Sequence, residues 1–235
     1  MARRFAGVLL MDGRWQGRYG PARMNARPDK APPVPPHPGL DVREDSIVWN
    51  GRFPLQRVRF TYERFDGARS GELTWELWRR GGAVVVLPYD PWSDRIALIE
   101  QFRLPALAAG FKPIMTECVA GLLEPGEDPL EAARRETLEE SGLEPDLMET
   151  VGHFMLMQGG CDEHVRVFCG RVRLAADAQG QFGLVAEHED TRVRVMAAAE
   201  GFAMIDGGEM QNATGALALM WLRHHRDRLR REWAA

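Results

Sequence analysis

A run of glutamates between Gly121 and Leu143 is the part of the sequence best suited to chemistry. Glu136 and Glu140 stand four residues apart, so a helix would place both carboxylates over one site. Two carboxylates about 4 Å apart repel by roughly 4 kcal/mol at an effective dielectric of about 20, so their grouping needs a reason. Hard divalent cations take oxygen ligands and leave room for water and phosphate. A solvated acidic helix face is the alternative, but the glycine-rich bend before the run favours a cation site.

The residues around the glutamates predict a capped helix. Asp128 can act as the N-cap, Pro129 fits the first helical position, and Gly142 stands where a helix C-terminus favours glycine. At about 100° per residue, the glutamates fall on one arc and a stripe of other side chains on a second arc. We expect the carboxylates to point away from the core, and the stripe that packs on it to consist of Leu130, Ala133 and Thr137.

The same stretch resembles the Nudix box, G-x5-E-x7-R-E-U-x-E-E-x-G-U, in which U is a bulky aliphatic residue. Thr137 at the first U position is a mild departure that a helix core tolerates. The flanking segments IEQFRLP, ECVAGLLEPGE, QGGCDEHVRVFCGRV and EHEDTRVRV are similar to the ADP-ribose pyrophosphatase subgroup of Nudix hydrolases, from about residue 46 to the C-terminus. The box positions that match are Gly121, Glu127, Arg135, Glu136, Glu139, Glu140, Gly142 and Leu143.

The resemblance implies a Mg²⁺ site, with Mn²⁺ as an alternative cation. Glu139 would be a supporting ligand or an ion-pair partner of Arg135, and so belongs with the candidate catalytic residues. Glu127 would either orient the loop before the helix or form a salt bridge within that loop. The ligands that the resemblance implies are the backbone carbonyl of Ala120 and the carboxylates of Glu136, Glu140 and Glu189.

A carboxylate near the metal would take the proton from the attacking water. The resemblance assigns this role of general base to Glu187, in the polar loop before the strand TRVRV. Glu163, which follows Gly159-Gly160, is the competing base and a candidate substrate contact. His153, His164 and His188 have no metal-type spacing, and we expect them to be ordinary surface or core histidines.

Substrate contacts follow from the same resemblance. Arg103 would neutralise a phosphate oxygen through its planar fork, although a surface ion pair with Glu100 is an alternative. The similar enzymes are homodimers that exchange N-terminal strands, so each nucleoside pocket draws on both chains. An aromatic platform for adenine would come from Arg52-Phe53. Trp75 stands where similar enzymes often carry Arg, so it either stacks on the base or fills the dimer interface. Further expected contacts are Glu76 and Arg80 in this pocket, and Leu122, Met157, Gln158 and Gly159 at the phosphates.

Composition bounds the remaining possibilities. A hydrophobic content of 45% in 235 residues supports a hydrophobic core. A net charge of −4 shows no excess of positive charge of the kind that binds nucleic acid. No apolar run approaches the roughly 20 residues of a membrane span. Three cysteines without metal-type spacing indicate reduced thiols in a cytoplasmic protein.

Composition also suggests three regions. Residues 1–45 form an N-terminal extension that contains the Pro-rich stretch APPVPPHPGL; its order is left open, as is Met24 as the true start. Residues 46–80 read as alternating strands with hairpin turns at Asn50-Gly51 and Asp66-Gly67. Residues 81–235 read as the hydrolase domain, with buried strands, the box helix, further strands and a final helix over about 213–232.

The sequence therefore predicts an α/β (α+β) Nudix fold, an α/β/α sandwich around a mixed sheet, with N-terminal antiparallel strands exchanged in a dimer. The expected activity is hydrolysis of ADP-ribose to AMP and ribose 5-phosphate. Hydrolysis of another nucleoside diphosphate sugar or a dinucleotide is the enzymatic alternative. A non-catalytic ADP-ribose-sensing module and a dimeric scaffold that uses the Pro-rich arm as a partner ligand are the alternatives from other classes. The intact box glutamates disfavour the sensing module.

Overall fold

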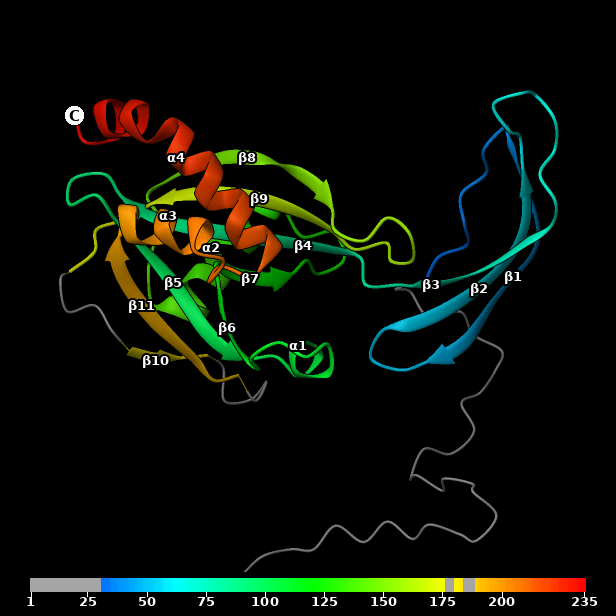
Figure 1. The fold of residues 1–235 in the computed structure, drawn as a ribbon, viewed down its shortest axis with the longest axis horizontal. Helices are drawn as coiled ribbons and strands as arrows, with labels where there is room; N and C mark the ends of the chain where they lie inside the picture. The colour runs from blue at the N-terminus through cyan, green and yellow to red at the C-terminus, as the bar shows by residue number, and fades with distance from the viewer. Residues whose placement is uncertain (1–30, 176–179, 184–188) are drawn as a thin grey trace, which may run out of the picture. The chain divides into compact units, whose positions relative to one another are not determined.

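The computed structural model describes residues 31–175, 180–183 and 189–235, which form two compact units, Met1–Arg80 and Gly81–Ala235. The N-terminal unit is an antiparallel sheet in the order β1-β2-β3 (Figure 1). The predicted turns at Asn50-Gly51 and Asp66-Gly67 lie between these strands, but the first strand starts earlier than the predicted run from residue 46. The strands are β1 (Leu40–Asn50), β2 (Pro54–Tyr62) and β3 (Leu73–Trp78).

A buried polar network fastens the Pro-rich segment to this sheet. Gln56 is fully buried, donates to Asp45 and accepts from Arg79. Asp45 Oδ2 in turn accepts from the backbone N–H of Val34 at 3.0 Å, and Arg79 Nη1 donates to the carbonyl of Pro32 at 3.3 Å. This part of the arm is therefore held by its own unit, which disfavours its use as a free ligand for a partner.

The second unit is built on an eight-stranded mixed sheet in the order β10-β11-β5-β4-β9-β8, with β6 paired to β5 and β7 to β4. The β4–β9 pair is parallel and the other pairs are antiparallel. The strands are β4 (Gly82–Asp90), β5 (Arg95–Phe102), β6 (Ile114–Glu117), β7 (Val119–Leu122), β8 (Leu147–Met155), β9 (His164–Arg171), β10 (Gly180–Phe182) and β11 (Thr191–Ala197). The helices are α1 (Leu104–Ala108), α2 (Pro129–Ser141), α3 (Ala198–Asp206) and α4 (Ala213–Trp233).

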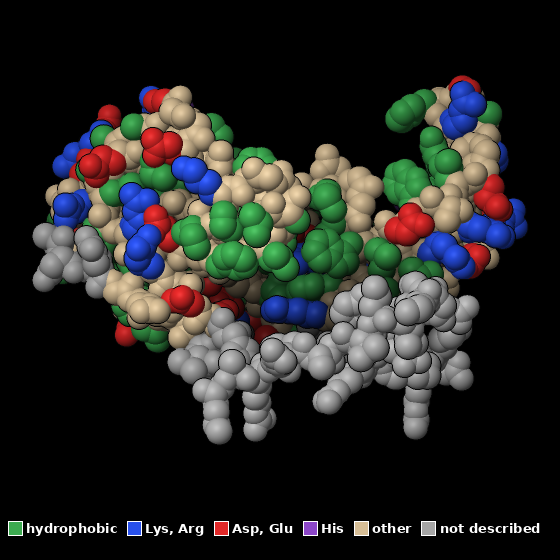
Figure 2. Space-filling model, turned by 60° about the horizontal axis from the view of Figure 1, so that its bottom comes forward, with side chains coloured by type: hydrophobic (Ala, Val, Ile, Leu, Met, Phe, Trp, Pro, Cys, Tyr) green, Lys and Arg blue, Asp and Glu red, His purple; other side chains and the backbone are tan. Residues whose placement is uncertain are grey.

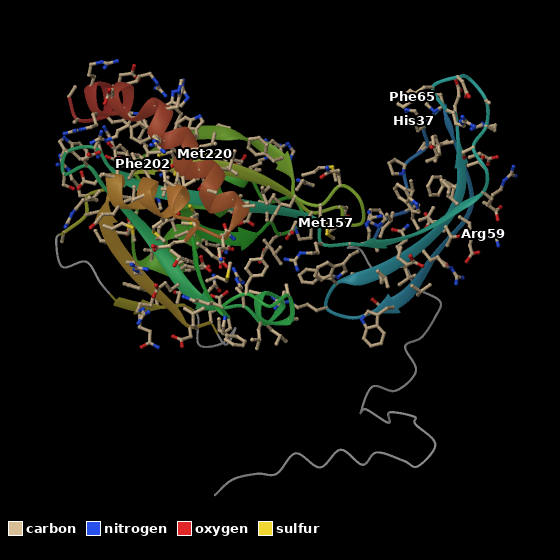
Figure 3. The ribbon with its side chains drawn as sticks, in the orientation of Figure 1. His37, Arg59, Phe65, Met157, Phe202 and Met220 are labelled. Atoms are coloured by element: carbon tan, nitrogen blue, oxygen red, sulfur yellow. The ribbon has the colours of Figure 1, made fainter. Side chains whose placement is uncertain are left out.

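Side-chain alternation along β4 divides the core into two layers. Val85 belongs to the cluster formed with α3 and α4, whereas Val84 belongs to the cluster that contains Ala132 of α2. Phe202 of α3 is buried in the first cluster, while Met220 lies on the exposed side of α4 (Figure 3). Helices thus cover both faces of the sheet, which confirms the predicted α/β/α sandwich (Figure 1).

Two short elements were not predicted, α1 and β10. Each has fewer residues than the periodic patterns from which helices and strands are predicted. The predicted final helix, by contrast, differs from α4 by one residue at its end. Among the described residues, no helix is both long enough and apolar enough to cross a membrane. Cys118, Cys161 and Cys169 are buried and form no disulfide.

Candidate active site

The helix that carries the glutamates begins and ends as predicted. Asp128 Oδ1 accepts from the backbone N–H groups of Leu130 at 2.9 Å and Glu131 at 3.2 Å, and Pro129 is the first helical residue. Gly142 ends α2 in the left-handed region, at φ 66°, where glycine carries no steric penalty. These caps fix the helix register, and so fix which glutamates face the sheet.

The expected direction of the carboxylates was wrong for two residues. Glu136 and Glu140 are 9% and 3% exposed and lie on the buried side of α2 with Ala133 and Thr137. A helical wheel assigns charged residues to the solvent, but here they face β7, against which α2 packs. Leu130, expected in the core, is 37% exposed in the first turn of the helix. The buried face of α2 is therefore partly acidic.

Strand β7 is shaped around these carboxylates. A Cβ atom added to Gly121 would lie 1.8 Å from Glu136 Cδ, so only glycine leaves room for that carboxylate. The next carboxylate on the same side of the helix, that of Glu140, accepts from the backbone N–H of Ala120 at 3.0 Å through Oε2. Both side chains are thus seated directly against the main chain at Ala120-Gly121.

The surroundings of Glu136 and Glu140 disfavour the negative charge of both carboxylates. Burial raises the pKa of Glu140 to about 8, assisted by the charges of Glu136 and Glu189 and opposed by the Ala120 N–H. Burial also raises the pKa of Glu136, where Arg135 acts in the opposite direction. Two buried carboxylates that resist ionisation, with a third within electrostatic range, fit a bound divalent cation, because its charge reverses this penalty. Within residues 31–175, 180–183 and 189–235, no three His, Cys, Asp or Glu side chains converge as a preformed cage.

Arg135 binds three glutamates of the box. Its guanidinium forms a two-point contact with Glu127, at 3.0 and 3.2 Å, and bonds to Glu136 at 2.8 Å and Glu139 at 3.1 Å. Glu127 Oε2 also accepts from the backbone N–H of Glu124 at 3.0 Å. Glu127 thus forms both the salt bridge and the loop contact that were left open, and Glu139 is an ion-pair partner of Arg135.

Arg103 pairs with a residue that the sequence did not single out. Its Nε and Nη2 donate to the two carboxylate oxygens of Glu117, at 3.0 and 2.7 Å, and Glu117 is 5% exposed. The alternative partner Glu100 instead binds Arg192 and Arg194. Residues three apart on an extended strand lie on opposite faces, which separates Arg103 from Glu100. The signal for Glu117 was its position in ECVAG, the segment that leads into the box; Glu117 is the last residue of β6.

The remaining phosphate candidates lie at β7 and in the β8–β9 connection. Leu122 ends β7. Met157 is half-exposed, and its carbonyl accepts from the N–H groups of Gly160 and Cys161 to close the turn that contains Gln158 and Gly159 (Figure 3). Glu163 follows this turn, and its carbonyl accepts from Leu156 N–H. Glu187, expected to be the general base, lies outside the described residues, as does His188.

The candidate adenine residues form two groups within the N-terminal unit. Arg80 lies over the rings of Phe53 and Trp78, with its guanidinium carbon 4.4 and 4.8 Å from their centroids. Arg52 lies over the same Phe53 ring at 5.5 Å. Trp75 instead packs edge-to-face on another ring, that of Phe60, with ring centroids 5.5 Å apart. Trp75 and Glu76 are neighbours on β3, so their side chains point to opposite faces of the sheet.

The histidines form no metal site with other side chains in the described ranges. His153 Nε2 and His164 Nδ1 lie 2.9 Å apart, joined by one hydrogen bond between β8 and β9. This contact satisfies one ring nitrogen of each histidine.

Comparison with known proteins agrees with this geometry. The NUDIX domain model matches residues 79–212. An ADP-ribose pyrophosphatase of Escherichia coli (strain K12) is 36% identical over 208 residues, which cover 88% of this chain and 99% of that protein. An ADP-ribose pyrophosphatase of Haemophilus influenzae is 31% identical over 200 residues, covering 83% and 90%. A crystal structure of an ADP compounds hydrolase shares the fold, with a TM-score of 0.62, 20% identity and coverage of 84% and 100%. The chain belongs to the Nudix family.

Proposed function

We propose that this protein hydrolyses the diphosphate of ADP-ribose to AMP and ribose 5-phosphate. The observation that carries the proposal is the buried pair Glu136 and Glu140, seated against Ala120-Gly121. Carboxylates in this arrangement serve a cation that faces a phosphate. The names of the relatives from Escherichia coli and Haemophilus influenzae support ADP-ribose as the substrate.

The cation is Mg²⁺, with Mn²⁺ as the alternative, and its ligands are the Ala120 carbonyl, Glu136, Glu140 and Glu189. When bound, the cation offsets the charge of the diphosphate and makes water a stronger acid. The raised pKa of Glu140 and the electrostatic reach of Glu189 to both box glutamates support this set. Glu139 supports the site through Arg135.

The chain's own residues bind the diphosphate and move the proton. Arg103 neutralises a phosphate oxygen. It has N–H donors left for this contact, because Glu117 binds only Nε and one N–H of Nη2. Glu187 takes the proton of the attacking water, and Glu163 is the alternative base. Backbone groups of Leu122 and of the turn at Met157, Gln158 and Gly159 complete the phosphate contacts.

The nucleoside part is recognised by the N-terminal unit. Phe53 is the candidate aromatic ring for adenine, and the guanidinium groups of Arg52 and Arg80 lie over this ring. Trp75 and Glu76 remain candidates on opposite faces of β3. Because Trp75 is 47% exposed, it has surface available for the base or for a second subunit.

A homodimer that exchanges the N-terminal strands is the proposed assembly. A three-stranded sheet needs a covered apolar face for stability, and Val48, Trp49 and Trp75 are exposed on this one. In the unit Gly81–Ala235, large apolar side chains are also exposed between residues 102 and 114, and Figure 2 shows hydrophobic side chains gathered on one face of this unit. A second copy would cover such surfaces. The three cysteines form no disulfide, which supports a reducing compartment, and the cytoplasm is the proposed location.

The test is product analysis after incubation with ADP-ribose and Mg²⁺ in ¹⁸O-labelled water. We expect AMP and ribose 5-phosphate, with the label on one of them, and slower turnover of UDP- and GDP-sugars. Faster turnover of those sugars would move the proposal to another nucleoside diphosphate sugar. Binding of ADP-ribose without any turnover would instead identify a sensing module.

A further inference from the structure

One buried hydrogen-bond donor beside the acidic cluster has no partner in the part of the chain that the structure describes. Among the described residues, Gln101 Nε2 is the one buried side-chain nitrogen or oxygen atom that makes no hydrogen bond. Burying an amide donor without a partner is destabilising by the cost of its lost hydration. Buried polar groups of proteins are nearly always paired, so an exception at the end of a central strand calls for a ligand that supplies the acceptor.

The strand register places Gln101 on the side of the sheet that holds the acidic cluster. Alternation along β5 puts Gln101 on the same face as Ile99, which packs in the cluster under α2, and as Arg103, which follows the strand. Glu100 between them lies on the other face, with Arg192 and Arg194.

The neighbours of Gln101 across the sheet connect it to the cluster itself. Its partner on β11 is Thr191, whose hydroxyl donates to the backbone carbonyl of Glu140 at 3.0 Å. Glu189 stands two residues before Thr191 in the chain. The unpartnered amide is therefore flanked by the strand that leads from Glu189 and by the end of α2 that carries Glu140.

We propose that Gln101 is a substrate-binding residue whose side-chain amide donates to a non-bridging oxygen of the bound diphosphate. A phosphate oxygen is an acceptor only, and so matches an amide that has two N–H groups to give. Gln101 and Arg103 then form a pair of donors, one neutral and one charged, on the same side of the sheet as the carboxylates. This inference rests on the proposed function, since it names a further contact to the same substrate.

The variant Gln101→Met tests the proposal because it keeps the length of the side chain and removes both donors. If the amide serves to bind substrate, its removal also removes the cost of burying an unpaired donor. Tm of the ligand-free protein should therefore rise by a few degrees. At the same time kcat/KM for ADP-ribose should fall about 10- to 100-fold, as for a lost hydrogen bond to a charged group. Gln101→Glu, which replaces the donors with a negative charge, should lose more activity.

Gln56→Met is the matched control, because Gln56 is also a buried glutamine but is bonded to Asp45 and Arg79. That variant should lower Tm. Inorganic pyrophosphate with Mg²⁺ is a second probe, which should raise Tm of the wild type more than that of Gln101→Met. Equal pyrophosphate shifts, unchanged kcat/KM, or a fall in both Tm and activity for Gln101→Met would overturn the assignment. A wild type that binds pyrophosphate but does not hydrolyse ADP-ribose would refute the proposed function alone, since the pyrophosphate comparison still decides the role of Gln101.

Discussion

The carboxylate of Glu136 occupies the space above Gly121 that a side chain would fill, since an added Cβ would lie 1.8 Å from Glu136 Cδ. The first glycine of the box and its central glutamate are thus a matched pair, one on β7 and one on α2. Gly121→Ala should displace the Glu136 carboxylate and lower kcat by at least about 100-fold, with weaker cation binding. Steady-state kinetics at saturating Mg²⁺ would measure this loss.

Gly71→Ala provides the control for that substitution. A Cβ at Gly71 would meet no atom within 4 Å, and its φ is not in the left-handed region. Its activity should remain within about two-fold of the wild type. Equal activity of Gly121→Ala and Gly71→Ala would refute the steric pairing of Gly121 with Glu136.

Stability of the cation-free protein should fall as pH rises, because of Glu140. Its pKa of about 8 in the folded state, against 4.5 as the ordinary value, means that the folded protein holds a proton which the unfolded chain has released. The free energy of unfolding should therefore decline between about pH 4.5 and 8. Urea denaturation across this range in EDTA would measure the decline.

Glu140→Gln isolates this contribution, since the amide does not titrate. The variant should show a flatter pH dependence than the wild type, and Mg²⁺ should counter the decline in the wild type only. Asp90 and Asp94, whose pKa values are lowered, titrate below this window in both proteins. Parallel wild-type and variant curves would show that the Glu140 carboxyl ionises at its ordinary pKa, and that its burial does not oppose the negative charge.

Glu117 should act through Arg103. Glu117→Gln weakens one side of the two-point contact and leaves the guanidinium less fixed, so KM for ADP-ribose should rise about 10-fold with a smaller change in kcat. Arg103→Lys should show a similar rise, and the double variant should be little worse than either single variant. Additive losses in this cycle would mean that Glu117 and Arg103 act independently.

Phe53 should contribute to binding of the base and not to the chemical step. Phe53→Leu removes the aromatic ring over which the Arg52 and Arg80 guanidinium groups lie, so KM for ADP-ribose should increase several-fold at unchanged kcat. Phe53→Tyr keeps the ring and serves as the control. A fall in kcat with unchanged KM would place Phe53 outside the adenine pocket.

Local signals in the sequence predicted much of this fold. Asp128, Pro129 and Gly142 determine where α2 starts and stops through caps that depend on neighbouring residues only, and the hairpin turns depend on equally local chemistry. The type of the sheet followed from runs of alternating and buried residues. Short elements such as α1 were not predicted, because five residues are too few to show a helical periodicity.

The arrangement of the site depended on tertiary contacts that no local rule supplies. A helical wheel places Glu136 and Glu140 toward solvent, and their burial follows from the packing of α2 on β7. Functional sites are where binary patterning is expected to fail, because a charge is buried there for a ligand. The Arg103–Glu117 pair needs the β5–β6 register, which brings residues 14 apart in the chain into contact.

Calorimetric titration with Mn²⁺ of the wild type, Glu136→Gln and Glu140→Gln would measure directly whether these buried carboxylates hold a divalent cation. We expect saturable binding to the wild type at pH 8, and affinity weakened at least about 10-fold in each variant while Tm is retained. Binding of equal strength in all three proteins, or none in the folded wild type, would contradict a cation site at Glu136 and Glu140.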